Sequence, residues 1–150
     1  MIKHIVLAAA MFGAAAARAE ILAETECYVR VTPSNDGKIV RLIFRRYVDM
    51  ELKKEVGSFV QYNHTKEIIP LVFSRHLDTD TDSPDLGNYE DTRIEILGNR
   101  VAGEYKFIQT GAGHRQGRYV RYTSAKNRKP VIFHHTGSDD DTSCKLTTKN

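Results

Sequence analysis

The sequence has no apolar run long enough to cross a bilayer as a helix, which needs about 20 apolar residues. Its longest run, Ile5 to Ala17, follows Lys3 and leads into Ala17-Arg18-Ala19, which has the small residues that signal peptidase requires. An amphipathic N-terminal helix is disfavoured because the run has no polar face. The sequence therefore predicts a signal peptide at residues 1–19 and one domain at residues 20–150, periplasmic or secreted.

The sequence also lacks a lipoprotein signal and a large net charge. Glu24-Thr25-Glu26 precede Cys27, so the site lacks the apolar and small residues of a lipoprotein signal, and no second hydrophobic stretch follows. The whole chain has 22 Lys and Arg against 19 Asp and Glu, a net charge of +3, and removal of Lys3 and Arg18 leaves about +1. This balance gives no support for a nucleic-acid partner or an anionic membrane surface.

Signatures of catalysis and of metal binding are missing as well. There is no G-x-S-x-G motif, and no histidine pattern typical of a zinc site. The neighbours His134 and His135 would point to opposite faces of a strand. The acidic run Asp78–Asp85 has Ser83 and Tyr89 where a calcium loop of the EF-hand type needs Gly and Glu. We expect no enzyme activity, no cofactor and no metal, and an acidic surface loop whose calcium binding the sequence leaves open.

The chain has two cysteines, Cys27 and Cys144, and both lie in the predicted domain. An even number of cysteines in an exported chain predicts a disulfide, and the alternative is a pair of buried thiols. A bond between residues so far apart would bring the first and last strands together, as closure of a barrel requires.

Short runs with alternating apolar and polar residues dominate the predicted domain. Such runs with polar turns are typical of an all-β fold, here an antiparallel eight-stranded barrel or a barrel-like sandwich. A four-residue spacing of Val48, Leu52, Val56 and Val60 also predicts a short helix over Asp49–Val56. Strand candidates are Cys27–Thr32, Lys38–Val48, Ser58–Asn63, Glu67–Arg75, Thr92–Leu97, Arg100–Gln109, Arg118–Thr123, Pro130–His135 and Ser143–Thr148.

A glycine-rich loop from Thr110 to Gly117 is the candidate binding segment. Gly111, Gly113 and Gly117 make it conformationally permissive, and His114 and Arg115 give it basic side chains. A rigid sheet can present such a loop to a partner, although a long hairpin connection without a further role explains the same residues.

At this loop the chain resembles the membrane-bound and periplasmic inhibitors of c-type lysozyme, which are small exported β-barrels of Gram-negative bacteria. Thr110-Gly111-Ala112-Gly113 is similar to the Ser-Gly-Ser-Gly of their recognition loop, and Arg115 stands where they have Lys. Lys126-Asn127 falls near the position of their Lys-Gly, and they too link a first-strand cysteine to one near the C-terminus. Ala112 and Gln116 depart from the family's Ser and Tyr.

The resemblance implies a protein-binding inhibitor in which Thr110, Gly111, Gly113, Arg115 and Lys126 contact the lysozyme cleft. Basic loop residues would then face the paired carboxylates with which lysozyme cuts peptidoglycan. One alternative is a periplasmic immunity protein against a delivered toxin. Another is a carrier of a small apolar ligand, with an interior lined by Tyr105, Phe107, Tyr119 and Phe133. The sequence does not indicate an oligomeric state.

Overall fold

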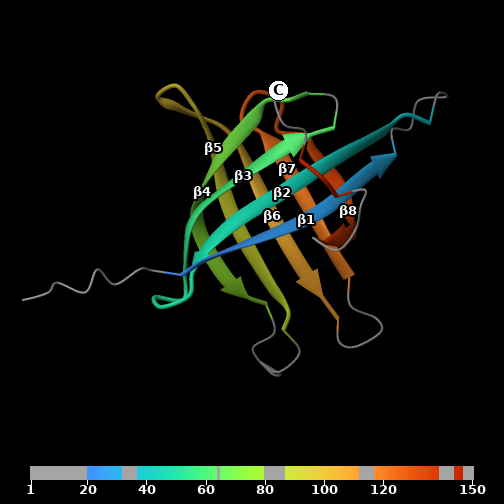
Figure 1. Ribbon diagram of the computed structural model, residues 1–150. Helices are drawn as coiled ribbons and strands as arrows, with labels where there is room; N and C mark the ends of the chain where they lie inside the picture. The colour runs from blue at the N-terminus through green and yellow to red at the C-terminus, as the bar shows by residue number, and fades with distance from the viewer. Residues whose placement is uncertain are drawn as a thin grey trace, which may run out of the picture.

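The computed structural model describes residues 20–31, 37–63, 65–79, 87–111, 117–138 and 144–146. Each strand pairs antiparallel with the next along the chain, and β1 also pairs with β8, which closes a barrel (Figure 1). This confirms the predicted eight-stranded antiparallel barrel. The strands are β1 (Ile21–Val31), β2 (Ile39–Asp49), β3 (Lys54–Tyr62), β4 (Ile68–Asp78), β5 (Tyr89–Leu97), β6 (Arg100–Thr110), β7 (Gly117–Ser124) and β8 (Pro130–Ser138).

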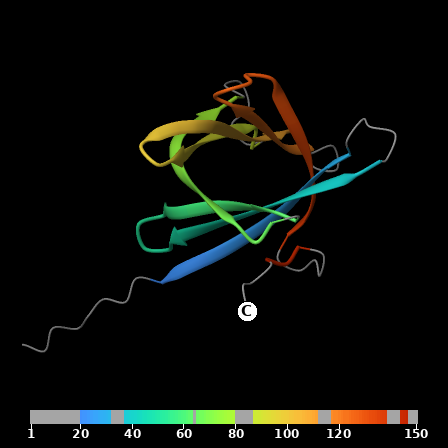
Figure 2. The same ribbon diagram turned by 90° about the horizontal axis from the view of Figure 1, so that it is seen from above.

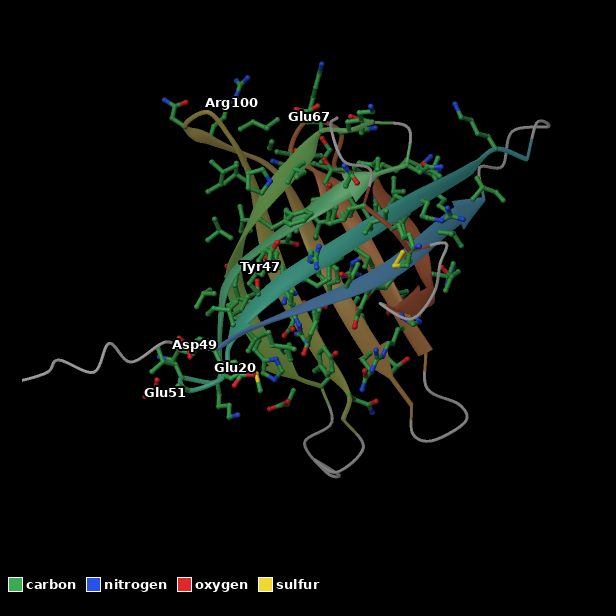
Figure 3. The ribbon with its side chains drawn as sticks, in the orientation of Figure 1. Glu20, Tyr47, Asp49, Glu51, Glu67 and Arg100 are labelled. Atoms are coloured by element: carbon green, nitrogen blue, oxygen red, sulfur yellow. A yellow bond between two sulfur atoms is a disulfide. The ribbon has the colours of Figure 1, made fainter. Side chains whose placement is uncertain are left out.

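The connections alternate between the two ends of the barrel because every strand runs opposite to its neighbours. The end where β1 begins and where β2, β4 and β6 finish is called here the lower end, and the other the upper end, as seen in Figure 1. Figure 3 places Glu20, Asp49 and Glu51 at the lower end, and Glu67 and Arg100 at the upper end. Seen from above, the strands follow one another around a ring until β8 returns beside β1 (Figure 2).

Alternating side chains of the strands fill the middle of the barrel. An eight-stranded barrel has an interior that side chains just fill. The inward residues of β2 and β6 illustrate this, since they pack together at the centre of the core. The buried apolar cluster comprises Tyr28, Leu42, Phe44, Val60, Leu71, Tyr105, Phe107, Val120 and Phe133.

The disulfide lies outside the barrel wall. Cys27 and Cys144 are bonded with their Cα atoms 5.6 Å apart, and they pack with Ile43 and Leu146 in a second, smaller cluster (Figure 3). The neighbouring Tyr28 points into the core instead, because side chains alternate along β1. The predicted disulfide is therefore confirmed, and it ties the segment after β8 to the outer face of β1 and β2.

The predicted helix over Asp49–Val56 is wrong, since these residues form the hairpin between β2 and β3. The Asp49 carboxylate accepts hydrogen bonds from the backbone N–H groups of Glu51 and Leu52, both at 2.9 Å, and this holds the turn. Leu52 and Val56 are more than half exposed, so their four-residue spacing buries no helical face.

Two further expectations need correction. The described part of the predicted strand Ser143–Thr148, Cys144–Leu146, is not in a strand. Tyr119 is not in the core, because the next residue on β7, Val120, points inward and leaves Tyr119 on the outer face. The predicted signal peptide at residues 1–19 lies outside the described residues, as does Asp78–Asp85 except for Asp78 and Thr79.

Candidate functional site

The residues of the predicted binding surface are divided between the two ends of the barrel. Thr110 ends β6 and Gly111 follows it at the lower end, whereas Lys126 lies in the β7–β8 turn at the upper end. The eight residues of β7 separate the two sites, and at about 3.4 Å per residue they span roughly 25 Å. Gly113 and Arg115 lie outside the described residues.

The base of the Thr110–Gly117 loop is tightly closed. Thr110 and Gly117 face each other as the last pair of the β6–β7 ladder. A Cβ atom added to Gly117 would come within 3.3 Å of the Thr110 hydroxyl oxygen, so glycine allows the close approach. Gly111 has a φ of +82°, a value that L side chains rarely adopt. The two glycines therefore shape the points where the loop leaves the strands.

Polar side chains inside the lower end brace this loop base. Arg118 donates to the Gln109 side-chain oxygen at 2.8 Å and forms an ion pair with Glu26 at 3.3 Å. Gln109 in turn donates to the Gly87 carbonyl at 2.8 Å, and the Tyr28 hydroxyl donates to Glu26. The network joins β1, β6, β7 and the residues before β5, so it ties these segments together beside the loop base.

Burial raises the pKa of the Tyr28 hydroxyl well above its ordinary value, and the nearby Glu26 carboxylate raises it further. Tyr28 therefore stays protonated and acts as a donor to Glu26, as the geometry requires. The space among these side chains is about 10 Å³, which is close to the smallest volume that can hold one water molecule.

A larger depression, called here the side groove, opens between β3 and β4 at the lower end. These two strands pair only through Ser58–Gln61 with Ile68–Leu71. In the described part of the chain, no strand pairs with the facing edges of Lys54–Gly57 on β3 and Val72–Asp78 on β4. The groove has a volume of about 560 Å³ and is lined by residues of β1 to β5 and of the β2–β3 turn.

Arg93 of β5 lies at the floor of the side groove and is 1% exposed. It donates two hydrogen bonds to the Glu55 carboxylate of β3, at 2.5 and 3.2 Å, and lies 3.5 Å from Asp91. Its guanidinium carbon is 4.8 Å from the ring centres of Phe44 and Phe107. The Arg93 side chain therefore links β5 to β3 at the place where the backbones of β3 and β4 do not pair.

One nitrogen of Arg93, Nη1, is buried and has no hydrogen-bond partner among the described residues. The aromatic rings around the guanidinium compensate part of the lost hydration through cation–π contact. The bidentate pair with Glu55 uses the other side of the guanidinium fork.

His76 of β4 stands at the rim of the side groove. Its ring nitrogens lie 2.6 Å from an Asp91 oxygen and 3.0 Å from an Asp78 oxygen. The hydrogen bond to Asp91, aided by Asp78, raises the pKa of His76 above its ordinary value. A protonated His76 adds a positive charge to the rim and donates to both carboxylates.

The upper end holds a second polar cluster, built around tyrosines. The hydroxyls of Tyr62 and Tyr105 are 3.0 Å apart, and Tyr122 is hydrogen-bonded to Glu95. Burial raises the pKa of the Glu95 carboxyl, and burial together with the Glu95 charge raises the pKa of Tyr122 to about 12. Lys126 borders a depression of about 500 Å³ beside this cluster, far from Thr110.

Most polar side chains of these clusters are paired with one another. Within the described ranges, no three His, Cys, Asp or Glu side chains are grouped so that they would hold a metal ion. His134 is exposed and His135 points inward against Tyr28, so the two lie on opposite faces of β8 as expected.

The buried pair of Arg93 and Glu55 was not predicted from the sequence. Along β5, Ile94 and Ile96 are the apolar alternates, which favours their face as the inward one. The structure places Asp91, Arg93 and Glu95 inward instead. The sequence signal for this burial was the alternation of acidic and basic residues along β5, because oppositely charged side chains on one face can be buried as a pair.

No known protein family, curated protein or solved structure matches this chain. None of the described residues belongs to a helix of the length and hydrophobicity that crossing a membrane requires.

Proposed function

We propose that this protein is an exported inhibitor that binds another protein and performs no catalysis, with a c-type lysozyme as its first candidate target. The observation that carries the proposal is the filled interior of the barrel. Apolar side chains pack the middle, and paired charges occupy the lower end. A barrel filled in this way has its outer surface and loops available for function.

The Thr110–Gly117 loop is the contact surface that we propose. Thr110 is exposed at the rim, and the Gln109–Arg118 bond directly beneath it keeps the loop base in place. A rigid base lowers the entropy cost of binding. Thr110 would donate a hydrogen bond in the lysozyme cleft, and Arg115 would approach its two carboxylates.

The division of residues between the two ends narrows this proposal. Lys126 does not share a surface with Thr110, since β7 lies between them. We therefore assign the contact to the lower end alone. Without Lys126, the resemblance to lysozyme inhibitors rests on the glycine-rich loop and the cysteine pair.

Export remains part of the proposal. The Cys27–Cys144 disulfide is consistent with an oxidising compartment, such as the periplasm or the extracellular space. The alternative of an apolar-ligand carrier gains nothing from the packing, because Tyr105, Phe107 and Phe133 fill the core that would hold the ligand.

The test is inhibition of a c-type lysozyme by the oxidised domain, followed as the clearing of a peptidoglycan suspension. We expect inhibition at micromolar concentration or below, and its loss in the double variant Thr110→Ala/Arg115→Ala. Arg100→Ala at the upper end is the matched control and should inhibit like the parent protein (Figure 3). Absence of inhibition by the parent protein would refute lysozyme as the target and leave a delivered toxin as the partner to test.

A further inference from the structure

The open edges of β3 and β4 offer backbone groups to a further strand. Lys54–Gly57 and Val72–Asp78 flank the side groove, and each segment is paired on its other side, with β2 and β5 respectively. In a strand paired on one side, alternate residues direct their N–H and C=O groups toward the vacant side. An extended peptide that enters such a gap can pair with both edges.

The side chains beside these edges suit an added strand in which apolar and polar residues alternate. Val72 and Leu77 of β4 are exposed on the outer face next to the gap. Alternate residues of an added strand would lie beside them on this outer face, while the others would point into the groove. Apolar residues at the outward positions would therefore cover an apolar surface that is now exposed to water.

The charge of the groove determines which side chains of the added strand are favoured at the positions that point inward. Arg46 is paired with Glu24 at 2.5 Å, and Arg93 is paired with Glu55. In contrast, Lys53 and Lys54 line the groove without an acidic partner in the described part of the chain. The groove is lined by four Lys and Arg side chains and three Asp and Glu side chains, so the excess of positive charge is at Lys53 and Lys54 and favours acidic side chains in the part of the occupant that lies there.

We propose that the side groove receives an extended acidic segment of the partner protein, which pairs as an additional strand between β3 and β4. This inference rests on the proposed function in that the partner is a protein. A second copy of this chain is the less suitable occupant, because it would bring another Lys53 and Lys54 toward the same basic rim.

The test uses two synthetic peptides of equal length, one alternating Val with Asp and the other alternating Val with Lys. Hydrogen exchange of backbone amides is measured by NMR in the free protein and with each peptide. We expect amides of the two open edges to exchange rapidly in the free protein, and the Val/Asp peptide to slow them by at least about tenfold. The Val/Lys peptide should have no such effect.

Charge reversal tests the basic rim. Lys53→Glu/Lys54→Glu should weaken binding of the Val/Asp peptide by at least about tenfold, since two attractive contacts become repulsive. The control Arg128→Glu/Lys129→Glu changes the same number of exposed charges at the upper end and should bind like the parent protein. Circular dichroism of both variants verifies that the barrel is folded.

The inference is overturned if the edge amides are already protected in the free monomer, if both peptides bind equally or not at all, or if protection comes from self-association. Lysozyme inhibition is measured separately, so the two proposals fail separately. Inhibition without peptide binding would refute only the proposed added strand, whereas peptide binding without inhibition would refute only lysozyme as the target.

Discussion

Replacing Arg93 by Met tests whether this ion pair holds the barrel closed beside the side groove. Arg93 is 1% exposed, and the side chains of Glu55 and Asp91 are each 10% exposed. Removing the cation leaves the largely buried Glu55 carboxylate without its partner, whereas Asp91 keeps His76, and the broken buried pair costs about 3–5 kcal/mol by analogy with other such pairs. The lost contacts with Phe44 and Phe107 add about 0.5–2 kcal/mol. This total is a large part of the roughly 5–15 kcal/mol that stabilises a typical domain.

The assay is unfolding of the oxidised protein in guanidinium chloride, with the free energy obtained at a common slope. Arg121→Met is the control, since Arg121 is 40% exposed and lies 3.6 Å from Glu90; an exposed pair of this kind contributes less than about 1 kcal/mol. In the double variant Arg93→Met/Glu55→Gln the loss should be smaller than the sum of the single losses, because the unpaired Glu55 charge is gone. Equal stability losses in Arg93→Met and Arg121→Met, or strict additivity, would refute the reasoning.

Three further predictions concern stability. Removal of the disulfide by Cys27→Ser/Cys144→Ser, whose ends are 117 residues apart, should lower the free energy of unfolding by about 4–5 kcal/mol, and an unchanged midpoint would contradict this. Gly103→Ala would place a Cβ 2.5 Å from Cε2 of Tyr122, so we expect a loss of about 1–3 kcal/mol in thermal unfolding, with full stability as the opposing result. Because burial raises the pKa of Glu95, the folded state holds a proton that the unfolded chain releases, and stability should fall as pH rises from 4.5 through the folded pKa. Glu95→Gln should abolish this fall in denaturation at several pH values, and an identical pH profile in the variant would count against it.

Part of the fold followed from local pattern because each strand contains its own alternation. Leu42 and Phe44, alternate apolar residues of β2, lie inward, and the turn at Leu97–Arg100 joins β5 and β6 with Gly98 at a φ of +64°. The helix predicted at Asp49–Val56 failed because a four-residue spacing also arises by chance across a hairpin, where no common face exists.

The candidate site was less predictable because it depends on contacts between distant residues. Arg93 and Glu55 are 38 residues apart, and nothing near either residue indicates the other. Bulges at Ser74 of β4 and at Ala102 of β6 also shift the alternation, so inward and outward positions cannot be counted continuously along these strands.

The sequence by itself determined the class of structure: alternating short runs, polar turns and two distant cysteines led to a disulfide-bonded antiparallel barrel. Only the tertiary structure decided which face of β5 is buried, which loops share an end, and where β3 and β4 separate. The physical reason is that alternation distinguishes two faces of a strand but does not orient them. Orientation is set by partners on other strands, such as the carboxylate that lets Arg93 stand inside the barrel.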